Sequence, residues 1–110
     1  MNTNTNMTIL LRGYVSRGYK EICKNDKTRV GVFSVAVRPD VRKENVEFLQ
    51  IKTFGKLCDI TEQYLPVGAG CLISAQLHNN TYKKKDTGET VYSLELIARD
   101  IQILSSPRAK

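Results

Sequence analysis

The chain lacks several features that mark common classes of protein. Its 110 residues include no tryptophan and only three cysteines. Cys23, Cys58 and Cys71 are odd in number, widely spaced and without a Cys-x-x-Cys pair, so the sequence predicts neither a disulfide framework nor a zinc site. Free thiols in a reducing cytoplasm are the expectation.

Membrane and export signals are also missing. No apolar run approaches the roughly 20 residues that a membrane span needs, and the polar, uncharged segment 1–6 is unlike the basic and then apolar start of a secretory signal. We therefore expect a cytoplasmic protein with no membrane partner.

Candidate catalytic groups are scarce. The one histidine, His78, falls on the polar side of a predicted strand, and Gly68-Ala-Gly70 is followed by Cys71 instead of the Lys-Ser or Lys-Thr of a phosphate-binding loop. No serine or cysteine has the sequence context of a known nucleophile. The chain is expected to bind without catalysing a reaction and to need no cofactor.

What the sequence does contain is positive charge and enough apolar residues for a single core. Lysine and arginine number 17 against 11 acidic residues, which gives a net charge of +6 and favours polyanionic partners. With 41% hydrophobic residues, we expect one domain over residues 8–104. A disordered polar lead is predicted over residues 1–7, and a short basic C-terminal end over residues 105–110.

The periodicity of apolar residues predicts a mainly β protein. Alternation indicates strands over 7–16, 29–38, 46–56, 71–78 and 91–104, with 19–23 extending or pairing with the first. Segment 56–65 changes to helical spacing, with Leu57, Ile60, Tyr64 and Leu65 on one side. The polar segment 79–90 reads as a long hairpin arm. Five strands with one short helix between the third and fourth is the element order of the OB-fold barrel.

The strand over residues 46–56 carries the most informative pattern. Phe48, Gln50, Lys52 and Phe54 share one face, and Leu49 and Ile51 take the other. Rings beside cations suit single-stranded nucleic acid, because every base offers a π-face and every phosphate a negative charge. The alternative is a strand buried on both sides, with both rings packed in the core.

The strand over residues 29–38 has one large and one small face. Phe33, Val35 and Val37 alternate with Ser34, Ala36 and Arg38. The Phe33 side predicts core. The Ser34 side is small and polar, which leaves room for a ligand to lie across it.

An ordered series of segments resembles the bacterial and phage single-stranded-DNA-binding protein family. The series consists of Phe48-Leu-Gln-Ile-Lys-Thr-Phe54-Gly55-Lys56, a helix ending Tyr64-Leu65, Gly68, the strand 73–77, Asn80-Thr-Tyr82 and Thr87-Gly88. The resemblance covers roughly residues 8–104. It implies an OB-fold that binds and protects single-stranded DNA without sequence preference, in replication, recombination and repair.

The resemblance also implies site residues and an assembly. Phe48, Phe54 and Tyr82 match stacking positions, and two of these, Phe48 and Tyr82, are often tryptophan in the family. Members usually form homotetramers, so we expect a homo-oligomer, with a dimer as the alternative. The implied location is the cytoplasm of a bacterial cell or a phage-infected host.

Basic residues near these rings are candidate phosphate contacts. The candidates are Arg12, Arg38, Lys52, Lys56, Lys83, Lys84 and Lys85. The competing interpretation of the lysine triplet is a solvated loop.

Two departures from the family pattern affect the expected contacts. Val41 occupies a position that is often aromatic, and the chain closes on Ser-Pro-Arg-Ala-Lys instead of an acidic, aromatic tip. The second departure puts tail-mediated replication partners in doubt. The alternative functions are an OB-fold replication-restart accessory protein of the primosomal type and an OB domain that serves as a protein-binding scaffold.

Overall fold

The computed structural model describes residues 8–24 and 28–106. The predicted disordered lead at 1–7, the turn at 25–27 and most of the predicted basic end, residues 107–110, lie outside the described residues.

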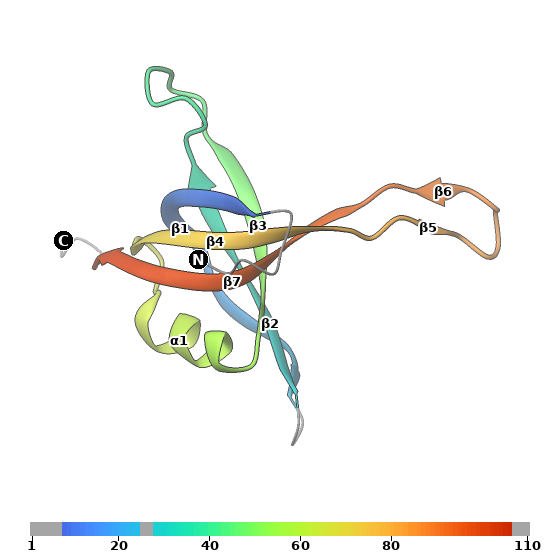
Figure 1. Cartoon of the computed structure of the whole chain (residues 1–110), viewed down its shortest axis with the longest axis horizontal. Coiled ribbons are helices and arrows are strands. Elements are labelled where there is room, and N and C mark those ends of the chain that lie inside the picture. Colours follow the sequence, from blue (N-terminus) through green and yellow to red (C-terminus); the bar gives the residue numbers. More distant parts are fainter. Residues whose placement is uncertain (1–7, 25–27, 107–110) are drawn as a thin grey trace.

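Five strands close into a barrel in the order β1-β2-β3-β7-β4 (Figure 1). The strands are β1 (Ile9–Lys24), β2 (Arg29–Val37), β3 (Glu47–Phe54), β4 (Gly70–Asn79) and β7 (Leu94–Ser105). Helix α1 (Lys56–Tyr64) connects β3 to β4. The β3–β7 pair is parallel, and the other barrel pairs are antiparallel. This arrangement confirms the predicted OB-fold barrel.

A hairpin arm projects from the barrel between β4 and β7 (Figure 1). Its short strands are β5 (Tyr82–Lys83) and β6 (Thr90–Val91), which pair antiparallel. The last predicted strand is therefore divided into two, because the chain leaves β6 at Tyr92–Ser93 before β7 begins.

Strand β1 is long because it serves both halves of the barrel. Its first part, from Ile9 to Tyr14, pairs with β4, and the part from Tyr14 to Lys24 pairs with β2. From Ile9 onward, the two predicted segments 7–16 and 19–23 thus belong to one strand, interrupted only by register shifts. At the bend, a Cβ on Gly13 would lie 2.5 Å from the carbonyl oxygen of Ala36, so only glycine fits there.

The core lies on the inner faces that alternation predicts for β2 and β3. Phe33, Val35 and Ile51 are at most 1% exposed. In β7 the predicted unbroken alternation is wrong. Ala98 pairs with Ala75 and Asp100 with Ser74, so Arg99 is an extra residue. A bulge of this kind moves the inward positions from even to odd numbers.

The helix packs on the barrel along a stripe that only partly matches the predicted one. Leu57 packs against the core, as predicted. Cys58 and Thr61 are its buried residues, and Leu65, which follows it, is 1% exposed. Tyr64 is 57% exposed. The predicted inward position of Tyr64 is therefore wrong, because the packing of α1 against the barrel selects positions 58, 61 and 65 as the inner stripe.

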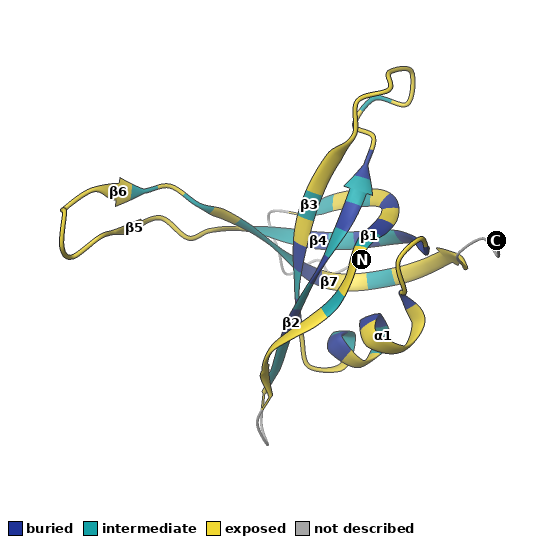
Figure 2. Cartoon of the chain, turned by 180° about the vertical axis from the view of Figure 1, so that it is seen from behind, coloured by how far each residue is buried: buried dark blue, intermediate teal, exposed yellow. Residues whose placement is uncertain are grey.

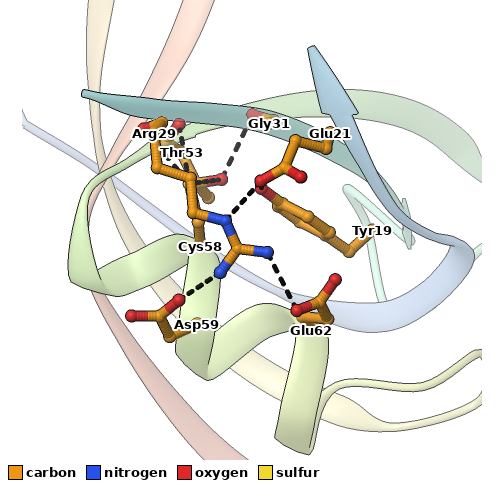
Figure 3. Close-up of polar contacts among 8 residues, drawn as sticks. All are labelled: Tyr19, Glu21, Arg29, Gly31, Thr53, Cys58, Asp59 and Glu62. Atoms are coloured by element: carbon orange, nitrogen blue, oxygen red, sulfur yellow. Dashed lines mark hydrogen bonds and ion pairs between the residues drawn. The ribbon is translucent and has the colours of Figure 1, made fainter. Parts of the chain in front are cut away.

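A cluster around Arg29 joins β1, β2 and α1 (Figure 3). The guanidinium forms ion pairs with Glu21, Asp59 and Glu62 and lies 5.2 Å from the centre of the Tyr19 ring. The hydrogen bond from Arg29 holds the pKa of Glu21 below its ordinary value. Thus the charge of Arg29 is neutralised within the fold.

Candidate nucleic-acid interface

The outer face of β3 carries both candidate rings. Phe48 is 70% exposed and Phe54 is 41% exposed, so the alternative of a strand buried on both sides is wrong. Between them, the Lys52 ammonium lies 5.7 Å from the centre of the Phe54 ring and 3.7 Å from Glu95 Oε1. This face therefore combines aromatic surface with a half-buried cation.

A groove of about 350 Å³ runs along this face. Its residues come from β3, from the base of the arm and from the neighbouring strands, and they include Ile22, Val32, Phe48, Gln50, Lys52, Ser93 and Leu94. Ile22 and Leu94 were not predicted as site residues. No sequence pattern distinguishes them from core residues, because only the fold brings them beside Phe48.

Phe54 lies outside this groove, on the wall of a larger hollow of about 820 Å³. The hollow is also lined by Leu10 of β1 and by Ile97 and Arg99 of β7. The two rings of β3 therefore face neighbouring depressions, and Lys52, which lines the first, reaches the ring of the second.

Tyr82 and the three lysines lie on the arm, most of which is exposed (Figure 2). Tyr82 is 52% exposed and pairs with Val91, while Lys83 pairs with Thr90. The arm tip is fixed by hydrogen bonds from Lys84 N to Glu89 O (2.8 Å) and from Gly88 N to Lys84 O (2.9 Å). The structure thus places this ring beside the basic triplet but away from the β3 groove.

The remaining predicted cations are spread around the barrel. Arg38 directly follows β2 and Lys56 begins α1, so these two flank the ends of the β2–β3 pair. Arg12 pairs with Leu72 of β4 and lies on another part of the barrel. Within residues 8–24 and 28–106, none of these three forms an ion pair.

Comparison with known proteins identifies the family. Residues 6–104 match the model of the Single-strand binding protein family. The chain belongs to this family. One relative is Single-stranded DNA-binding protein 1 of Chlorobaculum tepidum. It is 33% identical over 64 residues, which cover 58% of this chain and 40% of that protein.

Other relatives give the same picture. The Single-stranded DNA-binding protein of Xylella fastidiosa is 30% identical over 80 residues, which cover 70% of this chain and 48% of that protein. The family member described here therefore spans less than half the length of these two curated relatives.

Solved structures agree with the fold. The mitochondrial single-stranded DNA binding protein Rim1 of S. cerevisiae superposes with a TM-score of 0.72 at 18% identity, over 92% of this chain and 98% of that chain. In the described part of this family member, no helix is long and apolar enough to cross a membrane.

Proposed function

We propose that residues 8–104 bind single-stranded DNA without sequence preference and protect it. The observation that carries this proposal is the exposure of Phe48 and Phe54 on the outer face of β3, on either side of Lys52. Stacking of one base on one ring contributes about 1 to 3 kcal/mol and is independent of base identity. Two such rings, with Tyr82 on the arm, would hold a strand without reading its sequence.

The predicted cations would supply phosphate contacts along the path. Lys52 lines the groove, while Arg38 and Lys56 flank the β2–β3 pair. The exposed arm adds Lys83, Lys84 and Lys85, and Arg12 would serve a part of the strand that reaches β4. Each neutralised phosphate should steepen the salt dependence of single-strand binding by about 0.7 log units per log unit of salt.

The biological setting is part of the same proposal. DNA replication, recombination and repair expose single strands that need protection, and the bacterial origin of the relatives supports the cytoplasm of a bacterial cell or a phage-infected host. A ring-and-cation surface binds without chemical change, so we propose no catalytic activity and no cofactor.

We further propose that the protein acts as a homo-oligomer, a tetramer with a dimer as the alternative. The open edge of β1 supports this: the stretch from Ile9 to Arg12 pairs with β4 on one side, and its pairing with β2 starts only at Tyr14. This edge has no strand partner among residues 8–24 and 28–106, and with Leu10 61% exposed beside it it is suited to pairing with a second copy.

Titration with oligo-dT over a range of salt concentrations tests the binding proposal. Wild type should bind with a salt-sensitive affinity, bind RNA of equal length no more tightly, and lose affinity when Phe48 and Phe54 are both changed to alanine. Native mass spectrometry should show one long oligonucleotide per oligomer. Absence of salt-sensitive binding would favour the protein-scaffold alternative, and tighter binding of RNA would contradict the DNA role.

A further inference from the structure

The outer face of β2 carries only small or medium-sized side chains, and it lies between β3 on one side and β1 on the other. Its outward residues are the small or medium-sized Val32, Ser34 and Ala36, all only partly buried. Strand register connects each of them to one residue on each neighbouring strand. The resulting rows are Phe48–Ala36–Tyr14, Gln50–Ser34–Arg17 and Lys52–Val32–Lys20.

The β1 members of these rows point to the same side as the β3 members. Directly paired residues in antiparallel strands project from the same face of a sheet, and Ala36 is paired with both Phe48 and Tyr14. Burial agrees, because Val15 is 2% exposed whereas its neighbour Tyr14 is 60% exposed. Arg17 and Lys20 are exposed as well.

The outward residues of β3 and of β1 have matching chemistry on the two sides of the small side chains of β2. One side offers the Phe48 ring and the Lys52 cation, and the other offers the Tyr14 ring with Arg17 and Lys20. Neighbouring strands lie about 4.8 Å apart, so β1 and β3, with β2 between them, are separated by about 10 Å. Among the described residues, Arg17 and Lys20 form no ion pair, which leaves both charges available.

The Tyr14 ring has a fixed neighbour at its end of the row. Tyr14 also pairs with Gly70 of β4, and a Cβ at Gly70 would lie 3.3 Å from Tyr14 Cε1. The ring therefore lies close to the glycine, where a larger residue would crowd it.

We propose that Tyr14, Arg17 and Lys20 form a second wall of the DNA site. The first wall consists of the outward residues of β3, Phe48, Gln50 and Lys52. The floor between the two walls consists of Val32, Ser34 and Ala36. Tyr14 stacks on a base, while Arg17 and Lys20 contact phosphates. This inference rests on the proposed function and extends the DNA path from β3 across β2 to β1.

The ring is tested by comparing Tyr14→Ala with Tyr64→Ala in oligo-dT titration. The two tyrosines are matched in exposure, since Tyr14 is 60% exposed and Tyr64 is 57% exposed, but Tyr64 lies on α1. Tyr14→Ala should weaken binding by about 5- to 150-fold, the range that corresponds to the loss of one stacked base. Tyr64→Ala should leave binding unchanged, and Tyr14→Phe, which keeps the ring, should bind like wild type.

The cations provide an independent test that does not depend on how well Tyr14→Ala folds. The double variant Arg17→Ala/Lys20→Ala should lower the slope of log affinity against log salt by about 1.4, for two phosphate contacts. The charge-preserving variant Arg17→Lys/Lys20→Arg should keep the wild-type slope.

The outcomes separate this inference from the function on which it rests. If wild type does not bind oligo-dT, the proposed function fails. If wild type binds and Phe48→Ala weakens binding, but Tyr14→Ala behaves like Tyr64→Ala and the double alanine variant keeps the slope, the second wall alone is overturned.

Discussion

The inner and outer faces of the β2–β3 pair use the same residue type for opposite purposes. All three phenylalanines of the chain lie on these two strands. Phe33 faces the core and is 1% exposed, whereas Phe48 and Phe54 face outward and are 70% and 41% exposed. The comparison teaches that the face of the strand, not the residue type, separates rings that stabilise the fold from rings available to a ligand.

The largest expected difference between the faces is in stability. Phe33→Ala should lower the free energy of unfolding by about 3 to 5 kcal/mol, because it leaves a cavity in the core. Phe48→Ala should change it little, since most of that ring is already in solvent. Urea unfolding followed by circular dichroism measures both variants, and an equal loss in the two would abolish the distinction between the faces.

The charged residues sharpen the same comparison. Arg29 forms three ion pairs within the fold, with Glu21, Asp59 and Glu62, whereas Lys52 lines the outer groove and, among the described residues, has one carboxylate partner, Glu95. Arg29→Ala should lower the melting temperature by several degrees and leave the salt slope of DNA binding intact. Lys52→Ala should lower that slope by about 0.7 with little effect on melting. Reversed effects would mean that the number of ion pairs a cation forms within the fold does not distinguish structural from binding cations.

Acid should weaken the Arg29 cluster. The pKa of Glu21 is lowered in the folded state, first by the hydrogen bond from Arg29. Its contribution to stability is therefore present above the unfolded pKa, about 4.3 for glutamate, and is lost as the pH falls through the lowered folded value.

Glu21→Gln is the matched variant for this acid effect. Between pH 5 and pH 3, the melting temperature of Glu21→Gln should fall less than that of wild type. This is the range in which the Glu21 carboxyl of the unfolded wild type takes up its proton. Identical pH profiles would contradict a role for the Glu21–Arg29 pair in stability.

The smallest expected effect concerns the thiols. Cys23 is exposed, whereas Cys58 and Cys71 are buried, and burial raises the pKa of Cys71 to about 11. Since the thiolate is the reactive form, a thiol reagent at neutral pH should label Cys23 in the folded protein and all three after denaturation. Rapid labelling of Cys71 in the folded state would show that the inner face opens readily.

Much of this comparison could be predicted from the sequence, because strand alternation has a period of two. Position alone predicts that Phe33 faces the core and that Phe48 and Phe54 share one face of β3, opposite Leu49 and Ile51. The exposure of that shared face was one of two alternatives, and the fold decides between them. Features that depend on register could not be predicted. The extra residue Arg99 reverses the parity of β7, and register shifts along β1 bring Arg17 opposite Ser34.

Contacts between distant segments were equally inaccessible to the sequence. Arg29 meets Glu62 across 33 positions, and neither residue stands in a recognisable motif. Tyr64 was expected to be buried because helical spacing places it on the same side of the helix as Leu57 and Leu65. Spacing alone does not show which residues of that side contact the barrel. Its exposure depends on how α1 lies against the barrel.

Fluorescence of a Phe48→Trp variant tests the central claim most directly, because the chain contains no tryptophan and the new ring would be the only reporter. A base stacked on this ring should quench its emission in proportion to bound oligo-dT, with affinity at least equal to that of wild type. A Tyr64→Trp variant should keep its emission. Unchanged emission of the position-48 tryptophan at saturating oligo-dT would contradict the claim that the outer face of β3 stacks on DNA bases.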